Sequence, residues 1–370
     1  MVYLTIKYNI ACYACLEISV PSHYQGVVSV EKRDIIVVGA SAGGIEALST
    51  VLRALPATMA AAMLIVNHLP AHVPSQLAQI LARQSEPPVE QAQDGLPIRS
   101  GRIYVAPPDY HILLEPGVMR LLHGPKENRF RPAIDPLFRT AAKAYGSRVI
   151  GVVLTGSLDD GTAGLLAIKR HGGLAVVQDP AEALFPSMPR SAIRHVAVDH
   201  VVKLENLPAL FNELTDSRHS GASPEAETPP PAPKAQRELE RLQVDELAGT
   251  PSVFSCPECH GTLWEIQDET LTRYRCRTGH AFSPESMLGQ QMETLEEALW
   301  SALKTLEEHT ALLRRLADDS RGRNHQRIAA GFETRIQAAE ARASVIRTVL
   351  LDGALTKPLE EFTESPRNTA

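Results

Sequence analysis

Residues 35–44 read IIVVGASAGG. The four β-branched residues at the start of this segment predict a buried strand, and the glycines that follow predict a sharp turn into a helix. Ser41 lies in that turn, at the C-terminal end of the strand. Two interpretations stay open: free N–H groups at a helix N-terminus bind phosphate, and the same turn exposes a nucleophilic serine beside amides that hold an oxyanion. The dinucleotide pattern G-x-G-x-x-G fits poorly, because Ser41 stands at its second glycine.

Short apolar runs alternate with helix-length segments from this strand to about residue 211, which is typical of parallel strands joined by helices. Strands are expected at residues 35–38, 63–66, 149–154, 174–177 and 198–203. Turn signals around residues 102–106 and 111–114 predict a β-hairpin beside the sheet. We therefore predict an α/β fold, with a three-layer, doubly wound and mainly parallel sheet decorated by a β-hairpin.

The composition is that of an ordinary globular chain. Its 370 residues carry 37 Lys and Arg against 43 Asp and Glu, a net charge of −6, and 44% hydrophobic side chains. This composition excludes wholesale disorder and argues against general nucleic-acid binding, which needs an excess of positive charge. No apolar run of ~20 residues occurs, so no transmembrane helix is expected. Five cysteines are too few for a disulfide scaffold, which favours the cytoplasm.

Composition shifts along the chain predict the domain boundaries. Residues 217–234 read SRHSGASPEAETPPPAPK, a proline-rich stretch that buries too little apolar surface to fold. For the first 33 residues we expect a disordered tail or a mis-called start codon. The predicted order is an N-terminal tail (1–33), an α/β domain (34–214), a linker (215–250), a zinc-ribbon-like segment (251–284), a helical hairpin (285–352) and a C-terminal tail (353–370).

Two long amphipathic segments near the C-terminus predict the helical hairpin. Their apolar positions are spaced alternately by three and four residues, as in the seam of a left-handed coiled coil. The expected seams are Met292, Leu295, Leu299, Ala302, Leu306, His309 and Leu313 in the first helix, and Ile328, Phe332, Ile336, Ala339, Ala343, Ile346 and Leu350 in the second. Residues 320–322 are the expected turn. Either the two stripes only pack on each other, or the hairpin also self-associates or binds a partner helix.

Two further polar residues follow predicted strands. His68 comes after the strand at 63–66, and Asp160 comes after the strand at 149–154. Because the C-terminal ends of parallel strands share one edge of a sheet, Ser41, His68 and Asp160 can meet there. A serine nucleophile needs a base and a group that orients the base, so this placement favours the nucleophile interpretation. The order Ser, His, Asp argues against an α/β-hydrolase, in which the acid precedes the histidine.

Five segments of this part of the chain resemble one family. They read GASAGG, IVNHLP, NRFRPAIDPLF, VVLTGSLDDGTAGL and FPSMPRSA, and they are similar to the catalytic domain of the chemotaxis protein-glutamate methylesterases, the CheB family. The resemblance implies a serine hydrolase that demethylates glutamyl methyl esters, and also deamidates glutamines, on chemoreceptor cytoplasmic helices in chemotactic adaptation, with no cofactor for catalysis. It implies that Ser41 is the nucleophile, His68 the general base and then acid, and Asp160 the residue that orients His68.

The same resemblance suggests substrate contacts. Arg129 and Arg131 in the NRFRP segment, Ser157 in TGSL and Met188 in FPSMPRSA are the predicted substrate-binding residues. Ser157 stands where the family's T-G-M-G pattern has methionine, which puts substrate fit and rate in question. The typical enzyme also carries an N-terminal receiver domain that is phosphorylated, and only 33 residues precede Asp34. We therefore expect no control by phosphorylation in cis.

A cysteine cluster in the late part of the chain predicts a metal site. Two residues separate Cys256 from Cys259, and three separate Cys276 from His280. Paired knuckles at ribbon-like spacing supply four soft ligands for a tetrahedral Zn²⁺, and four protein ligands make such a site structural. The alternative is a set of buried thiols. Acidic residues offset the nearby arginines, so a folding or protein-docking role is favoured over nucleic-acid binding.

The sequence therefore predicts a cytoplasmic serine hydrolase of the protein-glutamate methylesterase type, linked to a zinc ribbon and a helical hairpin. Its expected partners are the methylated chemoreceptor cytoplasmic domain and, through the hairpin, a chemosensory array protein or a second copy of the chain. Two alternatives stay open. Ser157 motivates a weakly active adaptor of the receptor array, and the missing receiver motivates a stand-alone hydrolase of another ester or amide.

Overall fold

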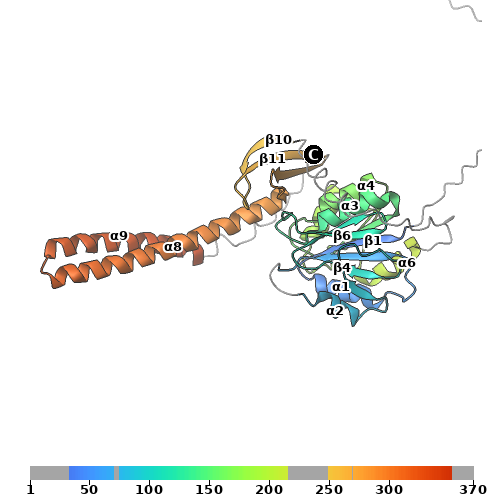
Figure 1. Cartoon of the computed structure of the whole chain (residues 1–370), viewed down its shortest axis with the longest axis horizontal. Coiled ribbons are helices and arrows are strands. Elements are labelled where there is room, and N and C mark those ends of the chain that lie inside the picture. The colour runs from blue at the N-terminus through green and yellow to red at the C-terminus, as the bar shows by residue number, and fades with distance from the viewer. Residues whose placement is uncertain (1–32, 71–74, 216–248, 269, 352–370) are drawn as a thin grey trace, which may run out of the picture.

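The computed structural model describes residues 33–70, 75–215, 249–268 and 270–351. Within these ranges the chain forms an α/β unit, a small antiparallel sheet and a long helical hairpin (Figure 1). The predicted tails (1–33 and 353–370) and the predicted linker (215–250) lie almost wholly outside the described residues.

A seven-stranded parallel sheet forms the centre of the α/β unit. Its strands are β1 (Ile35–Ala40), β2 (Ala62–Asn67), β3 (Val89–Gln91), β4 (Ile103–Val105), β7 (Val149–Val153), β8 (Leu174–Gln178) and β9 (His200–Val202). They lie in the order β3-β4-β2-β1-β7-β8-β9. β1, β2 and β7 are buried along their whole length, as expected for strands covered on both faces. Since β1 pairs with β2 on one side and β7 on the other, the C-terminal ends of these strands meet at a switch point in strand order.

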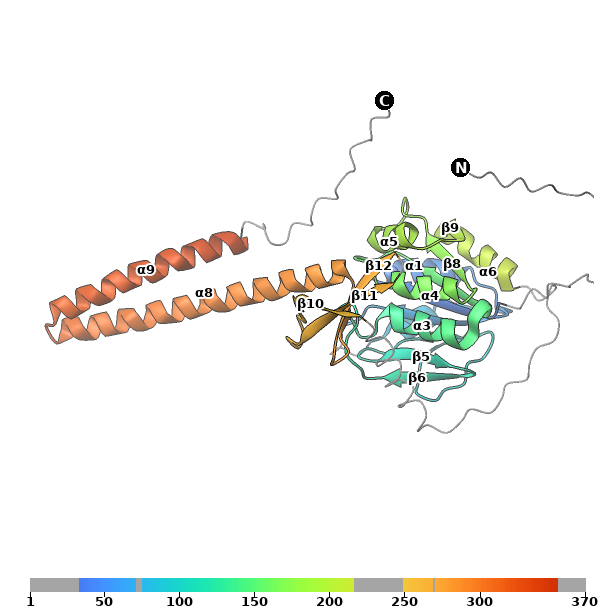
Figure 2. The ribbon, with the colours of Figure 1, turned by 90° about the horizontal axis from the view of Figure 1, so that it is seen from above.

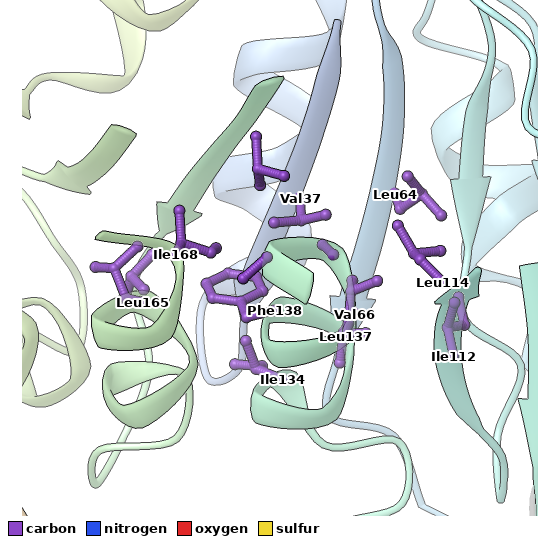
Figure 3. Close-up of a cluster of buried hydrophobic side chains, with 14 of the residues drawn as sticks. Val37, Leu64, Val66, Ile112, Leu114, Ile134, Leu137, Phe138, Leu165 and Ile168 are labelled. Carbon is purple, nitrogen blue, oxygen red and sulfur yellow. The ribbon is translucent and has the colours of Figure 1, made fainter. Parts of the chain in front are cut away.

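Helices cover both faces of this sheet (Figure 1). They are α1 (Gly44–Arg53), α2 (Leu77–Ala82), α3 (Ile134–Tyr145), α4 (Thr162–Arg170), α5 (Ser187–His195) and α6 (Leu207–Thr215), with short 3-10 helices at Gly146–Arg148 and Leu204–Asn206. α3, α4 and α5 contribute to the hydrophobic cluster on one face, where Phe138 and Leu165 pack over Val37 (Figure 3). α1, α2 and α6 contribute to the cluster on the other face. The predicted three-layer α/β fold is confirmed.

The β-hairpin lies later in the chain than the turn signals suggested. Residues 102–106 do not form one of its arms, because β4 joins the parallel sheet beside β2. The arms are β5 (His111–Glu115) and β6 (Val118–Leu122), which pair as a separate two-stranded sheet packed on α3. The turn between them is Pro116-Gly117, with Gly117 at a φ of 79°. β4 is fully buried and pairs with β2 on one side and β3 on the other, so it is an interior strand of the parallel sheet.

A four-stranded antiparallel sheet, which we call the ribbon, follows the predicted linker. Its strands are β10 (Thr250–Ser255), β11 (Thr262–Asp268), β12 (Leu271–Cys276) and β13 (Ala281–Phe282). The chain then enters α8 (Pro284–Gly322), and α9 (Gln326–Leu351) packs against α8 as the second arm of the hairpin. The hairpin projects away from the α/β unit (Figure 2). None of the described helices combines the length and the apolar character needed to cross a bilayer.

The buried seam of the hairpin agrees only in part with the predicted one. Leu313, Ala339 and Ala343 are buried as predicted. In α8, however, Leu295 is 44% exposed and His309 is also exposed, whereas Leu303 and Ala317, outside the predicted seam, are buried. In α9 the seam includes Ala329, while the predicted Ile328 is 53% exposed. The apolar stripe is wider than the strip that a single partner helix covers, so its spacing could not identify the covered half. The turn also differs, because α8 continues through residues 320–322 and α9 begins at residue 326.

Candidate active site

Ser41 lies on the turn between β1 and α1. Gly43 adopts a φ of 72°, the left-handed region that glycine enters without strain, and this allows the sharp change of direction. The Ser41 N–H donates to the Thr155 carbonyl at 3.0 Å, in the loop after β7. Gly156 in the same loop approaches so closely that a Cβ there would lie 2.9 Å from the Ser41 Cβ. The two loops together fix Ser41 at the C-terminal edge of the sheet.

His68 follows β2 and lies between Ser41 and Asp160. The His68 Nδ1 is 2.9 Å from the Ser41 Oγ, and the His68 Nε2 is 2.7 Å from the Asp160 Oδ2. The Phe130 ring stacks on the imidazole, with ring centroids 3.7 Å apart. With the proton on Nε2, the serine hydroxyl donates to Nδ1 and Nε2–H donates to the carboxylate. This continuous chain of hydrogen bonds has the chemical form of a serine–histidine–aspartate triad.

The Asp160 carboxylate is buried but is surrounded by donors. Its Oδ2 accepts the Ile134 N–H at 2.7 Å, at the start of α3, in addition to the His68 Nε2–H. Its Oδ1 accepts from the Asn128 side-chain amide at 2.8 Å and from the Gly161 N–H at 3.0 Å. Burial opposes ionisation, but the bond to His68 and these donors outweigh it and lower the pKa of Asp160. The positive end of the α3 dipole acts in the same direction.

Comparison with known proteins identifies the family of this part of the chain. A family model described as CheB methylesterase matches residues 36–211. A relative from Leptospira interrogans serogroup Icterohaemorrhagiae, named for protein-glutamate methylesterase and protein-glutamine glutaminase activities, is 43% identical over 182 residues, which cover 49% of this chain and 94% of that protein. The chain belongs to the CheB methylesterase family.

Other members of the CheB family match the same half of the chain. Protein-glutamate methylesterase/protein-glutamine glutaminase 2 of Anaeromyxobacter dehalogenans is 41% identical over 182 residues, covering 49% of this chain and 53% of that protein. The solved structure of the Thermotoga maritima CheB methylesterase catalytic domain is 34% identical, covers 50% of this chain and 98% of that chain, and has a TM-score of 0.48. These matches concern the α/β unit, so the ribbon and hairpin must be understood from their own residues.

Two other buried carboxyl groups lie near Asp160. Burial raises the pKa of Asp159 well above its ordinary value, although the Ser283 hydroxyl donates to its Oδ1 at 2.7 Å. Burial and the negative charge of Asp160 raise the pKa of Asp135 to about 7. Asp135 accepts the Gly164 N–H at 2.6 Å. Among these three aspartates, Asp160 has the lowered pKa and the bond to His68, so it is the one suited to orient an imidazole.

The two predicted arginine contacts are engaged inside the molecule. The Arg129 Nε donates to the Gln290 Oε1 at 3.3 Å, and Arg129 also forms an ion pair with Glu293 of α8. The Arg131 Nε donates to the Asp109 Oδ1 at 2.8 Å. The side chains of both arginines are less than one fifth exposed. The structure thus gives them partners within the chain and leaves little of either side chain open to a substrate.

Ser157 and Met188 lie on opposite sides of the loop after β7. Ser157 is exposed, whereas Met188 is fully buried under the loop, where a Cβ on Gly156 would lie 2.1 Å from its Sδ. Met188 therefore supports the floor beside Ser41, and Ser157 alone of the four predicted substrate-binding residues presents its side chain to solvent. Leu184 and Phe185 are exposed at 69% and 41% and add an apolar rim that the sequence analysis did not identify.

The predicted metal ligands converge in the ribbon. Cys256, Cys259, Cys276 and His280 bring one ligand atom each to within 4.8 Å of one another. The Cys259 Sγ is 3.6 Å from the Cys276 Sγ, and the His280 Nδ1 lies 3.7 Å and 3.6 Å from the sulfurs of Cys256 and Cys276. Tetrahedral Zn²⁺ with Zn–S bonds of about 2.3 Å requires ligand atoms about 3.8 Å apart. The donor set and its spacing fit that ion.

Sequence reasoning missed the residues that join the ribbon to the triad. Asn128 donates to Asp160 and accepts from the backbone N–H of Ser283 and the hydroxyl of Ser286. Asn128 is in the NRFRP segment, but nothing in its spacing indicates a partner more than 150 positions away. Ser283 and Ser286 form a capping box at the start of α8, which the usual Ser-x-x-Glu pattern does not detect because serine stands at the last position.

Proposed function

We propose that this chain hydrolyses methyl esters of glutamyl side chains on chemoreceptor cytoplasmic helices. Ser41 is the nucleophile, His68 the general base and then acid, and Asp160 the group that orients His68. The continuous hydrogen-bonded chain through Ser41, His68 and Asp160 is the observation that carries the proposal. Membership in the CheB family supports the choice of substrate, and the cytoplasm is the proposed location because such substrates are there.

The reaction proceeds in two steps. The Ser41 Oγ attacks the ester carbonyl carbon while its proton passes to the His68 Nδ1, and Asp160 stabilises the imidazolium through Nε2. The tetrahedral intermediate expels methoxide, which takes the proton from His68 and leaves as methanol. Water then attacks the acyl-serine, with His68 again as base, and releases a free glutamate carboxylate and Ser41. With glutamine as substrate, the leaving group in the same sequence is ammonia.

Backbone amides at the start of α1 are the proposed oxyanion donors. Within the described part of the chain, no acceptor is bound to the N–H groups of Ala42 and Gly43, which follow Ser41 on the turn. Amides at a helix N-terminus are oriented before the reaction starts, so they stabilise a developing negative charge without reorganising. Loss of one such donor typically costs about 10²–10³ in rate.

The test is methanol release from methyl-labelled chemoreceptor cytoplasmic fragments by the full chain. The expected result is release by the wild type and a loss of ~10³-fold or more in both Ser41→Ala and His68→Ala. Ser191→Ala is the matched control, because Ser191 of α5 accepts from Thr162 of α4 and, among the described residues, has no hydrogen bond to Ser41, His68 or Asp160. Equal release by the wild type and Ser41→Ala would overturn the proposal, as would release of methanol only from esters unrelated to receptors.

We also propose that the ribbon holds a structural Zn²⁺. Three thiolates and one imidazole close the coordination sphere, which leaves no position for a substrate. Purified chain should contain about one equivalent of zinc, and Cys259→Ser should reduce this content. Retention of full zinc content by Cys259→Ser, or an absence of zinc from the wild type, would contradict the proposal.

The helical hairpin is the proposed docking element, and its two flanks differ. On one flank, ion pairs link Glu307 with Arg347, at 2.6 Å, and Arg314 with Glu340. Arg321 and Glu333 add a third pair near the turn. Along each helix these residues recur every seven positions, and each directly follows a buried or half-buried residue of the seam. Because its charges are paired across the two helices, this flank has little capacity to bind a further charged helix.

The opposite flank is apolar and carries unpaired positive charge. Its apolar members are exposed at 44% (Leu295), 40% (Leu316), 53% (Ile328) and 38% (Val349). Among the described residues, no carboxylate forms an ion pair with Arg335 or Arg342 of α9. In a second copy of the chain, the same flank carries the same arginines and His309. Packing of the two flanks would therefore place positive charge against positive charge. The proposed occupant is therefore an amphipathic helix that presents glutamates beside leucines, as a methylesterase substrate helix does.

Charge reversal tests this docking. Arg335→Glu/Arg342→Glu should weaken binding of the full chain to a receptor cytoplasmic fragment by about tenfold or more, since like charges then face each other. Arg315→Glu/Arg327→Glu is the matched control with the same change of net charge on the outer faces of both helices. Equal weakening by the two double variants would contradict a specific flank. A dimer that Arg335→Glu/Arg342→Glu strengthens would identify a second copy as the occupant instead.

A further inference from the structure

The turn that carries Asn128 adopts a backbone that non-glycine residues avoid. Asn128 and the next residue, Arg129, have φ values of 47° and 76°. Left-handed conformations cost non-glycine residues about 1 kcal/mol or more and persist where the surrounding contacts determine them. A hydrogen-bonded pair, Glu127 with Phe130, closes the turn, and the Asn128 N–H donates to the Ala281 carbonyl of β13 at 2.8 Å. The ribbon is therefore one of the structures that hold this turn.

On its inner side, Asn128 supports the triad. Its side-chain Nδ2 donates to the Asp160 Oδ1 at 2.8 Å and to the Asp135 Oδ2 at 2.9 Å, so both amide hydrogens bind carboxylates. Asp160 uses its other oxygen, Oδ2, to accept from His68. The orientation of the Asn128 amide therefore bears directly on the direction in which the Asp160 carboxylate faces His68. Asn128 is 6% exposed, so water does not replace these bonds easily.

On its outer side, the start of α8 holds Asn128. The Ser283 N–H is shared between the Asn128 Oδ1 at 3.1 Å and the Ser286 Oγ at 2.9 Å. The Ser286 hydroxyl lies 3.2 Å from the Asn128 Oδ1 and 3.2 Å from the Ser283 carbonyl, so its one proton is shared between these acceptors. Ser286 is fully buried. These donors fix which end of the amide is oxygen, and hence that nitrogen faces Asp160. A cavity of about 160 Å³ adjoins Asn128 and Ser283, which gives the side chain room to change its conformation once a donor is lost.

We infer that Ser283 and Ser286, at the start of α8, are positioning residues for the active site: they orient Asn128, which in turn holds the Asp160 carboxylate toward His68. The C-terminal part of the chain thus completes the active site of the α/β unit. This inference rests on the proposed roles of Ser41, His68 and Asp160, but not on the identity of the ester.

The test uses a fluorophosphonate, which labels an activated serine by displacement of fluoride from phosphorus and needs no receptor. In the full chain, Ser286→Ala should slow the labelling of Ser41 by about tenfold to a hundredfold and shift the pH midpoint of labelling, because His68 then faces a displaced carboxylate. This change keeps one bond of the capping box, since the Ser283 hydroxyl still accepts the backbone N–H of residue 286, and removes the other, from the Ser283 N–H to the Ser286 Oγ. Ser286→Thr, which keeps the hydroxyl, should restore both rate and midpoint.

Two further variants separate positioning from loss of structure. Ser320→Ala is the matched control, because it removes a serine hydroxyl from the far end of the same helix. Asn128→Gly suits the left-handed backbone and removes only the amide, so it should slow labelling as Ser286→Ala does. If both changes act through one path, the double variant should be no slower than Asn128→Gly alone.

Wild-type labelling rates and pH midpoints in folded, zinc-loaded Ser286→Ala and Asn128→Gly would overturn the inference and leave the contacts as packing only. If Ser286→Ala fails to fold, the labelling rate and pH midpoint of Asn128→Gly test the inference instead. Normal labelling of the wild type without methanol release from receptors would contradict the proposed substrate and leave the positioning inference intact. A wild-type chain that does not label at Ser41 would overturn the triad and the inference with it.

Discussion

The seven-stranded sheet is covered by large hydrophobic clusters on both faces, whereas the ribbon buries a small cluster of which two members, Cys256 and Cys276, are predicted metal ligands. Apolar burial contributes about 25 cal/mol per Å², so the two clusters of the sheet stabilise the α/β unit without other help. A cluster as small as that of the ribbon cannot offset the entropy of ordering its loops. Packing therefore stabilises the α/β unit, whereas the ribbon depends on the proposed metal.

These two parts meet at the active site. Asp160 accepts from the start of α3, which belongs to the packed α/β unit, and from Asn128, which the start of α8 holds. The proposed catalytic residues therefore have the more robust support, and Asn128, one of the groups that contact them, depends on the start of α8. Four measurements test this division.

Metal removal should produce the largest effect. A structural Zn²⁺ contributes on the order of 10 kcal/mol to the folding of a small domain, so chelation should unfold the ribbon while the α/β unit keeps its own thermal transition. Limited proteolysis should then cut between residues 249 and 283, which the metal-loaded chain resists. Cleavage at the same rate with and without chelator would contradict the proposed dependence of the ribbon on a metal, because it would show that the ribbon folds by packing alone.

A large-to-small change in the sheet core should come next. Phe138 is fully buried between α3 and the sheet (Figure 3), and Phe138→Ala should destabilise the α/β unit by about 3–5 kcal/mol. Urea unfolding measures this loss. Phe185→Ala is the control, since Phe185 is 41% exposed and should cost much less. Zinc content should stay the same in both variants, and a parallel loss of zinc would show that the two parts are not stabilised independently.

The stability contributed by Glu127, which lies where the ribbon contacts the α/β unit, should decrease at low pH. Burial opposes ionisation of Glu127, but Arg139 and Arg275 of the ribbon outweigh it and lower the pKa to about 2, from an ordinary value of 4.5. A carboxylate with a lowered pKa stabilises the fold fully above its unfolded pKa and loses that contribution as pH falls through the folded value. The loss should occur between about pH 4.5 and 2 and amount to at most about 3 kcal/mol.

Urea unfolding of the wild type and Glu127→Gln across this range measures the Glu127 contribution. The wild type should lose more stability on acidification than Glu127→Gln does, because the variant has no carboxylate to protonate there. Parallel pH dependences in the two proteins would show that Glu127 does not join the ribbon to the α/β unit electrostatically.

The ion pairs of the hairpin should have the smallest effect. Glu307 and Arg347 are each about half exposed, and such pairs contribute about 0.2–1 kcal/mol. A double-mutant cycle with Glu307→Gln and Arg347→Gln should measure a coupling in this range, which high salt should reduce. Leu303→Ala in the buried seam should cost several times more. A coupling above about 2 kcal/mol would show that charge rather than packing stabilises the hairpin.

Local pattern was sufficient to predict the α/β fold and to bring the triad residues to one edge. The reason is geometric: glycine turns and apolar runs define the strands, and parallel strands place their C-terminal residues together. The paired cysteine knuckles predicted the cluster in the ribbon for the same reason, because metal coordination dictates short fixed spacings.

Local pattern could not predict contacts between parts that a linker separates. No periodicity relates Asn128 to Ser286. The first turn of α8 contacts Asn128 only because the ribbon packs against this part of the α/β unit. The strand order likewise depended on long-range pairing, since β4 and the hairpin arm β5 are both apolar and largely buried, and local pattern does not distinguish them. In α8, the half of the stripe that α9 covers depends on contacts between the two helices, which the apolar spacing of one helix does not record.

The continuity of α8 has a consequence for encounter rates. Its 39 residues, at 1.5 Å each, make an uninterrupted rod of about 58 Å from the active site to the turn of the hairpin. A partner bound near the tip of the rod is confined with Ser41 in a volume of about that radius, which corresponds to an effective concentration on the order of millimolar. One bound hairpin would thus let a single molecule of the chain visit many neighbouring ester groups before it diffuses away.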